Sequence, residues 1–237
     1  MKAFIFAAGK GTRLKPFTDQ HPKALAKVNG RGSLERNIRY LQSFGINDFI
    51  INIHHFGEQI LEFLEENKNF NANIEISDES RELLETGGAL VFAKEYIQQE
   101  EHLLIMNADI LTDLNIHDFI NFHLSSENFV SLAVSDRKSS RKLLFDDGMT
   151  LQGWRNETTG ETILNNTDKN LKPLAFSGVH CINTNLLKAM SRTGKFSIME
   201  EYLDLMKDYQ LKGYQHNATL IDVGKPESIA EAEQYFK

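Results

Sequence analysis

MKAFIFAAGKGTRLKPFTDQHPKAL (residues 1–25) is the stretch of this chain that says most about its fold and function. Its apolar residues 3–7 predict a buried strand, because a short apolar run bounded by turn-forming residues is typical of one. The run leads directly into residues 9–13, where glycines alternate with basic and hydroxyl side chains. Glycine lets the backbone approach a ligand closely, and backbone N–H groups can point at phosphate oxygens. The stretch therefore predicts a strand that ends in an anion-binding loop.

The charge of the chain is distributed unevenly. The 237 residues carry a formal net charge of −7, but residues 1–40 hold nine Lys and Arg against only Asp19 and Glu35. This gives +7 in the first segment and −14 in the remainder. A basic segment on an acidic body favours a small polyanionic ligand over a nucleic-acid polymer or an anionic membrane.

Cysteine content and apolar runs indicate the cellular setting. Cys181 is the only cysteine, which excludes a disulfide within the chain and favours a reducing compartment. The apolar run at the start ends at Ala8, which is too short for a signal peptide, and no stretch reaches membrane-spanning length. We expect a cytoplasmic protein, either a monomer or a small homo-oligomer, that binds neither nucleic acid nor membrane.

Strands and helices alternate along the first half at a spacing of about 25 residues. After the first strand, the pattern predicts strands at 48–54, 73–77 and 103–106 and helices at 34–44, 57–67 and 89–97, with a short extended piece at 24–28. Ser33 is expected to cap the first helix, and Gly87 and Gly88 to open the third. This alternation predicts an α/β fold with a mostly parallel sheet between two layers of helices, and ligands in such folds bind at the carboxyl ends of the strands.

The second half of the chain is less regular. We expect helices at 116–124, 185–190, 197–209 and 226–235, strands at 129–134 and 174–182, and a strand pair around 214–222. Turn dipeptides at 147–148 and 159–160 predict a β-hairpin insertion within residues 142–164. The sequence contains no internal repeat and no linker rich in Pro, Gly or Ser, so we expect one domain over residues 1–237.

Two common nucleotide-binding loops do not fit the opening stretch. The third glycine of G-x-G-x-x-G is absent, and the loop continues through Pro16 and Pro22 instead of opening a helix. The GK[ST] end of a P-loop is absent as well. What remains is the fifteen-residue pattern G-x-G-T-R-L-x-P-x-T-x-x-x-P-K over residues 9–23.

This pattern resembles the signature of the sugar-1-phosphate nucleotidyltransferase family, with one departure, Ala24, where the family usually has proline. Four later segments resemble, in order, the family's base-recognition loop, metal motif, sugar-site strand and second metal-ligand motif: Leu84–Gly88, Asn107–Asp109, Phe176–Gly178 and Ile221–Gly224. The resemblance implies a Rossmann-like three-layer sandwich of the nucleotide-diphospho-sugar transferase type. It also implies a nucleotide-binding half at about 1–112 and a half at about 113–237 that completes the sugar and metal sites.

The resemblance further implies roles for individual residues. The residues implied in catalysis are Arg13, Lys23 and Asp109. Those implied in nucleotide binding are Ala8, Gly9, Gly11, Thr12, Arg13, Lys23, Glu85, Gly88 and Asn107. The close backbone approach at Gly87 and Gly88 is expected to leave room for a planar base. Those implied in binding the sugar phosphate are Lys23, Asn107, Arg155, Asn156, Ser177 and Gly178. Asp109 and Asp222 are the implied ligands of Mg²⁺. Trp154, Arg155 and Asn156 stand where many relatives carry Glu-Lys-Pro.

The implied reaction transfers a nucleotidyl group from a nucleoside triphosphate, with UTP favoured, to a sugar 1-phosphate, and it releases pyrophosphate. Two polyanions must meet, so Lys, Arg, backbone N–H groups and Mg²⁺ have to offset their repulsion. Carboxylates such as Asp109 and Asp222 suit Mg²⁺ because it is a hard cation that prefers oxygen.

Within the family, the chain looks most like the N-acetylmuramate 1-phosphate uridylyltransferases. Guanylyltransferases that use GTP with mannose or heptose 1-phosphate are the next alternative. A CTP-using cytidylyltransferase acting on a phospho-alcohol is another. A non-catalytic subunit that binds a nucleotide or sugar phosphate and regulates a partner is the alternative from a different functional class.

Overall fold

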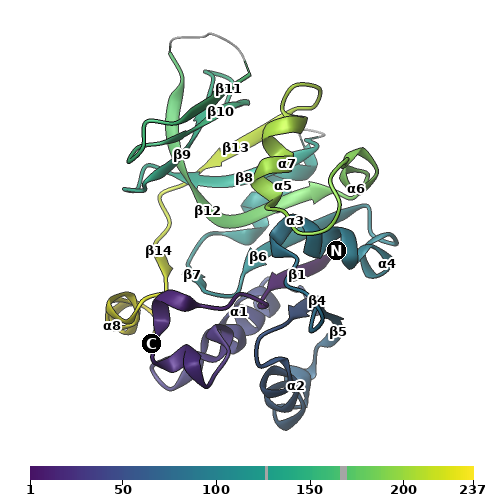
Figure 1. Cartoon of the computed structure of the whole chain (residues 1–237), viewed down its shortest axis with the longest axis vertical. Helices are drawn as coiled ribbons and strands as arrows, with labels where there is room; N and C mark the ends of the chain where they lie inside the picture. The colour runs from purple at the N-terminus through teal and green to yellow at the C-terminus, as the bar shows by residue number, and fades with distance from the viewer. Residues whose placement is uncertain (126–127, 166–169) are drawn as a thin grey trace.

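A large mixed β-sheet runs through the middle of the molecule (Figure 1). The computed structural model describes residues 1–125, 128–165 and 170–237. The strands of the sheet are β1 (Lys2–Phe6), β4 (Asp48–Ile53), β5 (Asn73–Asp78), β6 (His102–Asn107), β8 (Val130–Ser135), β9 (Arg141–Phe145), β10 (Leu151–Asn156), β11 (Thr162–Leu164), β12 (Lys172–Asn183) and β13 (Leu211–Gln215). They follow the order β11-β10-β9-β12-β6-β1-β4-β5, while β8 pairs with β12 and β13.

One part of this sheet, β6-β1-β4-β5, is parallel throughout. Ile5 lies opposite Ile51 on one side of β1 and opposite Met106 on the other. Near-continuous apolar strands are typical of parallel sheets that are covered on both faces, which is why the apolar runs located these strands correctly. Beyond β6, strand β12 is antiparallel to β6, β8 and β9. The predicted α/β class with a mostly parallel central sheet is confirmed.

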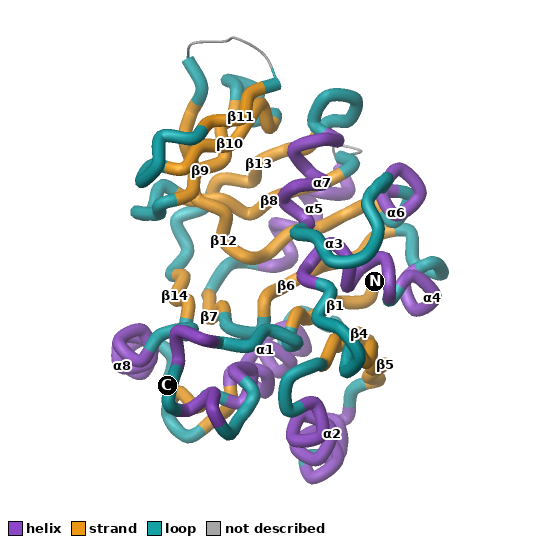
Figure 2. The backbone as a smooth tube through the Cα atoms, viewed as in Figure 1, coloured by secondary structure: helices purple, strands orange, loops and turns teal. Residues whose placement is uncertain are grey.

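Helices cover both faces of the sheet (Figure 2). Their bounds are α1 (Ser33–Gln42), α2 (Gly57–Glu66), α3 (Glu85–Phe92), α4 (Lys94–Ile97), α5 (Ile116–Ser125), α6 (Leu186–Ala189), α7 (Ile198–Leu205) and α8 (Pro226–Tyr235). Ile5 of β1 belongs to one core with α1, α2 and α5, whereas Phe4 belongs to the other core with α3, α4, α6 and α7. Alternating side chains of one strand therefore anchor two helical layers.

The expected insertion at 142–164 is present as the antiparallel strands β9, β10 and β11. They continue the main sheet, because β9 also pairs with β12, where Leu143 lies opposite Leu174. In Figure 1 these strands form the end of the molecule farthest from α2.

The expected strand pair around 214–222 is wrong. β13 pairs in parallel with β8, whereas β14 (Leu220–Asp222) pairs antiparallel with the short strand β7 (Ile110–Thr112), which the apolar pattern did not predict. The chain crosses between the two sheets at 216–219, where the His216 N–H donates to the carbonyl of Val134 and the Thr219 N–H donates to the carboxylate of Asp113. Residues 214–222 therefore do not form a strand pair with each other, because β13 bonds to β8 and β14 bonds to β7.

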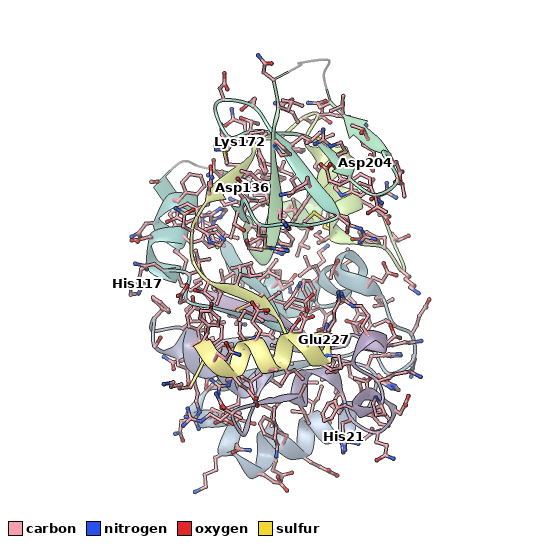
Figure 3. All side chains as sticks on the ribbon, turned by 90° about the vertical axis from the view of Figure 1, so that its left-hand side faces the viewer. His21, His117, Asp136, Lys172, Asp204 and Glu227 are labelled. Atoms are coloured by element: carbon pink, nitrogen blue, oxygen red, sulfur yellow. The ribbon has the colours of Figure 1, made fainter. Side chains whose placement is uncertain are left out.

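Helix α8 packs beside β14 and the small ribbon of β2 (Lys27–Val28) and β3 (Arg31–Gly32), in a third apolar cluster that includes Val28, Ile221 and Ala232. In Figure 3 this helix, marked by Glu227, crosses the lower part of the molecule, while Asp136 and Lys172 lie in the upper part. Within the described residues, no helix has both the length and the apolar character needed to cross a membrane.

Two helix starts differ from expectation. The Ser33 hydroxyl does not cap α1 but donates to the carbonyl of Ala24 at 3.0 Å. Helix α3 begins at Glu85, so Gly87 and Gly88 lie inside it rather than before it. The extended piece expected at 24–28 is replaced in its first part by a short 3-10 turn, η3 (Lys23–Leu25), and only β2 is extended.

Candidate active site

The glycine loop leaves β1 at the carboxyl edge of the parallel strands. The N–H groups of Ala7 and Ala8 donate to the side-chain oxygen of Asn52 at 2.7 and 3.4 Å. Gly11 has φ +60°, and a Cβ on it would lie 2.8 Å from Cβ of Lys23 and 2.9 Å from a methyl carbon of Thr18. Glycine is therefore required at 11 both by the backbone conformation and by the close packing of Lys23 against the loop.

Lys23 reaches the site from the turn η3. Its ammonium group forms an ion pair with Asp109, and both side chains are largely buried. The turn is held by bonds from Leu25 N–H to the Pro22 carbonyl and from Ala26 N–H to the Lys23 carbonyl. Neither bond uses the N–H of Ala24. The turn can therefore form with alanine at this position as well as with proline, which has no N–H.

The two carboxylates come together through the β7–β14 ladder. Asp222 lies opposite Ile110, and the Val223 N–H donates to the carbonyl of Asp109 at 2.9 Å. This short ladder explains how two aspartates more than a hundred residues apart in the sequence reach one place.

Arg13 and Gly224 complete the cluster. Arg13 approaches Asp222 with an N–O distance of 3.3 Å, and the Gly224 N–H donates to the other oxygen of Asp222 at 2.9 Å. A Cβ on Gly224 would lie 3.0 Å from Nζ of Lys23 and 3.2 Å from a guanidinium nitrogen of Arg13. The structure thus brings Arg13, Lys23, Asp109 and Asp222 together, as the sequence predicted.

The two carboxylates differ in their electrostatic environment. Burial raises the pKa of Asp109, against the opposing effect of the Lys23 ammonium. Burial also disfavours the charge on Asp222, but the Gly224 amide, Lys23 and Arg13 together outweigh it and lower the pKa of Asp222. The pair therefore combines one easily ionised carboxylate with one that depends on a nearby cation.

This donor set fits a hard divalent cation. Two carboxylates meet at an edge where phosphate oxygens can be supplied by ligands, which is the way Mg²⁺ is commonly held in proteins. Within residues 1–125, 128–165 and 170–237, no three His, Cys, Asp or Glu side chains gather at one point.

A cavity of about 340 Å³, here called the strand-end cavity, opens beside Lys23 and Asp109. It is lined by Phe6, Ala7, Ala8, Gly9, Lys23, Ala24, Asn52, Leu83, Glu85, Thr86, Asn107, Ala108, Asp109 and Ser197. Most of the predicted nucleotide contacts are in this lining. Gly11, Thr12 and Gly88 are outside it, and Arg13 lies on the other side of the charged cluster.

The physical reason for the glycine pair at 87–88 differs from the predicted one, which was room for a planar base. A Cβ on Gly87 would lie 2.3 Å from the ring of Phe196, and a Cβ on Gly88 would lie 2.1 Å from the carbonyl oxygen of Gly194. The Gly87 N–H also donates to the Phe196 carbonyl at 2.9 Å. The two glycines therefore let the segment before α7 pack onto α3, and only their neighbours face the strand-end cavity.

A second cavity of about 550 Å³, here called the basic cavity, lies beside Arg13 and Asp222. It is lined by Arg13, Arg137, Ser139, Ser140, Arg141, Lys142, Leu143, Trp154, Phe176, Met199, Leu220, Ile221, Asp222, Lys225, Ser228 and Glu231. Its cations outnumber its two acids. Arg137 is held by a bond from its guanidinium to the Phe176 carbonyl at 2.8 Å, and burial lowers its pKa despite the attraction of Asp222.

Sequence reasoning missed the cations of this cavity other than Arg13, although one signal was available. Residues 137–142 read Arg-Lys-Ser-Ser-Arg-Lys, directly after the apolar strand β8. A basic run at the end of a buried strand is a feature that could have indicated a second anion-binding wall.

The residues predicted to contact the sugar are placed differently from one another. Asn107 lines the strand-end cavity. Gly178, at φ +73°, lies against the side chain of Asn107, because a Cβ on Gly178 would be 3.2 Å from the amide nitrogen of Asn107. The Ser177 hydroxyl is fully buried and hydrogen bonds to His216 at 2.9 Å.

Arg155 and Asn156 lie outside the linings of both cavities. Arg155 forms an ion pair with Glu157 at 2.7 Å, and the Asn156 side chain accepts from the Thr158 N–H at 2.9 Å. In this structure both side chains are engaged by their own turn, and Trp154 is the member of this strand that lines the basic cavity.

A mostly parallel α/β sheet with a glycine loop, two cations and two carboxylates at its carboxyl edge defines a protein of the doubly wound α/β class, in which ligands bind at that edge. Residues 2–143 match the model of the nucleotidyl transferase family, and the chain belongs to that family.

Several proteins of this family are similar to the chain over nearly its whole length. It is 27% identical to a probable glucose-1-phosphate cytidylyltransferase of Bacillus subtilis, over 95% of this chain and 92% of that protein. It is 25% identical to an N-acetylmuramate alpha-1-phosphate uridylyltransferase of Caulobacter vibrioides, over 98% of this chain and 95% of that protein. It is also 25% identical to a mannose-1-phosphate guanyltransferase of Gibberella zeae, but it spans only 62% of the length of that protein.

The fold is also found in solved structures. HddC from Yersinia pseudotuberculosis superposes with a TM-score of 0.81 at 24% identity, over 100% of this chain and 99% of that chain. A putative glucose-1-phosphate thymidylyltransferase from Bacillus anthracis gives a TM-score of 0.81 at 15% identity, over 99% of this chain and 94% of that chain. The three-layer fold of the nucleotide-diphospho-sugar transferases, expected from the sequence, is thereby confirmed.

Proposed function

We propose that the protein transfers a nucleotidyl group from a nucleoside triphosphate to a sugar 1-phosphate and releases pyrophosphate. The observation that carries the proposal is the charged cluster between the two cavities. Lys23 and Asp109 line the strand-end cavity, whereas Arg13 and Asp222 line the basic cavity. A reaction that joins two anionic substrates needs both cations and a cation-binding carboxylate pair where the substrates meet.

In this proposal the strand-end cavity binds the nucleotide. Ala8, Glu85 and their neighbours frame the base, and the loop of Gly9, Gly11 and Thr12 offers N–H groups to the triphosphate. Gly88 supports this wall from behind through its packing on the segment before α7. The basic cavity then binds the sugar 1-phosphate. This assignment divides one domain into a nucleotide-binding half at about 1–112 and a half at about 113–237 that completes the sugar and metal sites.

The proposed chemistry is a direct displacement. An oxygen of the sugar 1-phosphate forms a bond to the α-phosphorus while the bond from that phosphorus to the β-phosphate oxygen breaks, and pyrophosphate leaves. Arg13 neutralises the leaving phosphates, and Lys23 holds the α-phosphate beside the incoming phosphate. Asp109 and Asp222 would hold Mg²⁺, which supplies positive charge to the phosphate oxygens. The protein contributes position and charge, and no covalent intermediate is required.

For the substrates we propose UTP and N-acetylmuramate 1-phosphate, in a cytoplasmic enzyme. The support is the resemblance of the segments at 84–88, 176–178 and 221–224 to uridylyltransferases, and the Caulobacter relative that carries this activity in its name. GTP with mannose 1-phosphate and CTP with glucose 1-phosphate are competing pairs, because relatives carry such names, and HddC has been solved in a complex with GMP-PN. GTP with heptose 1-phosphate is a further competing pair, from the sequence resemblance alone.

The test is pyrophosphate release from each of UTP, GTP, CTP and dTTP, combined with glucose, mannose, heptose and N-acetylmuramate 1-phosphates, in the presence of Mg²⁺. Release with UTP and N-acetylmuramate 1-phosphate that exceeds every other pair supports the full proposal. If release is highest with another pair, the result supports the proposed reaction class but contradicts the proposed substrates. A folded protein that binds nucleotide but releases no pyrophosphate with any pair contradicts the reaction class and favours a regulatory binding subunit.

A further inference from the structure

Asn52 stands at the carboxyl end of β4, behind the glycine loop. It is 3% exposed, and its side-chain oxygen accepts from the N–H groups of both Ala7 and Ala8. The side chain therefore fixes the backbone where β1 turns into the wall of the strand-end cavity. Two backbone donors in a buried segment that leaves its sheet are satisfied in this way.

Glu79 stands one strand farther, just after β5, and is only 2% exposed. One of its carboxylate oxygens accepts from the side-chain amide of Asn52 at 2.7 Å, and the other accepts from the N–H of Leu84 at 3.0 Å. Leu84 lies between Leu83 and Glu85, which line the opposite wall of the cavity. Asn52 and Glu79 thus form an unbroken hydrogen-bonded connection between the two walls, here called the Asn52–Glu79 bridge.

Within residues 1–125, 128–165 and 170–237, no Lys or Arg side chain pairs with Glu79, and its buried carboxylate is held by hydrogen bonds. Burial raises the pKa of Glu79, and the hydrogen bonds from Asn52 and Leu84, together with the nearby His54, oppose this shift only in part. An apolar pair of similar volume would often stabilise the fold equally well or better. What an apolar pair cannot do is hold specific backbone N–H groups on two segments at a fixed separation.

We propose that Asn52 and Glu79 are positioning residues that set the width of the strand-end cavity and thereby the affinity for the nucleotide. This inference rests on the proposed function, because it takes the strand-end cavity as the nucleotide site. The bridge has a direction: Asn52 must accept with its oxygen and donate with its nitrogen, and Glu79 must accept with both oxygens. This directionality gives an experiment with a rescue.

The experiment compares Asn52→Asp, Glu79→Gln and the double variant. In Asn52→Asp two carboxylates face each other, and in Glu79→Gln an amide N–H₂ faces a donor at one of its two contacts. In the double variant the introduced aspartate still accepts from residues 7 and 8, and the introduced glutamine donates to it and accepts from Leu84. The amide and the carboxylate have exchanged places, and every hydrogen bond of the bridge can form again.

The measurement is the Kd of UTP, GTP and CTP by titration calorimetry without sugar phosphate, together with KM for both substrates and the melting temperature. We expect each single variant to weaken binding of the preferred nucleotide about tenfold, since lost buried hydrogen bonds to charged groups have effects of this size. KM for the sugar phosphate should change less than twofold, and the double variant should bind within about threefold of the wild type. Asn128→Asp is the matched control, because Asn128 is equally buried but bonds to Ser131, away from both cavities.

The outcomes separate the inference from the proposed function. Single variants that fold and bind nucleotide as the wild type does would overturn the inference, and so would a double variant no better than the weaker single one. A loss of affinity in Asn128→Asp equal to that in the single variants would show a general effect of destabilisation and would also overturn it. If the wild type binds nucleotide but no pair of substrates reacts, the proposed reaction fails while the bridge is still tested by the Kd values.

Discussion

The strand-end cavity and the basic cavity meet at one charged cluster but are built in different ways. Five residues of the first lining have no side chain beyond Cβ, namely Ala7, Ala8, Gly9, Ala24 and Ala108, and among the described residues its charged members are Lys23, Glu85 and Asp109. The second lining contains several long cationic side chains, among them Arg137, Arg141, Lys142 and Lys225. A wall of small residues has a shape set largely by the backbone, whereas a wall of long side chains can be altered residue by residue. Under the proposed function, the nucleotide side is therefore the general part of the molecule, and the sugar-phosphate side is where specificity can vary.

Asp109→Asn is the strongest way to test whether the two cavities serve one reaction. We expect turnover to fall by roughly a hundred- to a thousandfold, because the charge that would balance Mg²⁺ and Lys23 is lost at the junction. The melting temperature should change little, since the side-chain volume is kept. Pyrophosphate release measures the effect, and Asp113→Asn, at an exposed aspartate outside both linings, is the control. Activity near the wild-type rate in Asp109→Asn would contradict the proposal that the two cavities serve one reaction through this carboxylate.

Buried histidines distinguish the halves of the chain in their response to pH. His123, His180 and His216 are buried and all lie after residue 112, whereas His21 is exposed. Burial, with a smaller effect of His102, lowers the pKa of His123 to about 4. Burial alone lowers the pKa of His180 to about 3. The part of the chain after residue 112 thus contains buried imidazoles that must stay neutral.

The direction in which pH changes the free energy of unfolding follows from proton linkage. Between pH 6.5 and pH 4 the unfolded chain binds a proton at position 123 that the folded chain does not, so the free energy of unfolding falls as the pH falls. For His123 this amounts to about 3 kcal/mol by pH 4. His123→Gln should flatten the pH dependence of stability in urea titrations between pH 7 and 4, while His21→Gln, at the surface in Figure 3, should not. Equal slopes in the two variants would contradict the assignment.

Gly88→Ala tests the statement that the strand-end cavity depends on backbone packing. The new Cβ would lie 2.1 Å from the Gly194 carbonyl oxygen, so α3 and the segment before α7 must separate. We expect a loss of about 2 kcal/mol in the free energy of unfolding, together with weaker nucleotide binding. Gly9→Ala is the control for stability, because a Cβ there meets nothing within 4 Å. Weaker nucleotide binding without any loss of stability would restore the original explanation, that the glycines only make room for the base.

Arg137→Gln addresses the basic cavity alone and has the smallest expected effect. Removing this cation should raise KM for the sugar 1-phosphate about tenfold, which corresponds to about 1.4 kcal/mol, and should leave KM for the nucleotide within about twofold. Steady-state kinetics with one substrate saturating measures each constant. Lys138→Gln, one residue along and outside the lining of the cavity, controls for the loss of one positive charge. An equal rise in both KM values would mean that the two cavities do not divide the substrates.

The sequence allowed prediction of those features that depend on neighbouring residues. The apolar strands and the loop at 9–23 belong to this kind, because each is recognisable within a short window. Asp109 and Asp222 were found through the family resemblance, but the β7–β14 ladder that joins them was not, since strands of three residues give almost no periodic signal.

Features that depend on distant parts of the chain were missed or explained wrongly. The reason for Gly87 and Gly88 lies with Gly194 and Phe196, more than a hundred residues later. Asn52 and Glu79 look like ordinary polar residues at strand ends until the fold places them side by side. Such pairings follow from tertiary packing, which single-sequence patterns do not encode.

The contact between Arg13 and Asp222 joins residues 209 positions apart. A chain emerging from the ribosome, at about 5–20 residues per second, presents the glycine loop, Lys23 and Asp109 well before β14 and α8 exist. The second carboxylate and one wall of the basic cavity come from residues 220–231, which are made after every other member of the charged cluster. Under the proposed function, a ribosome-bound product whose synthesis has not yet passed Asp222 cannot consume nucleotide. Activity in this protein therefore reports that synthesis has passed this segment and that the segment has folded against Asp109.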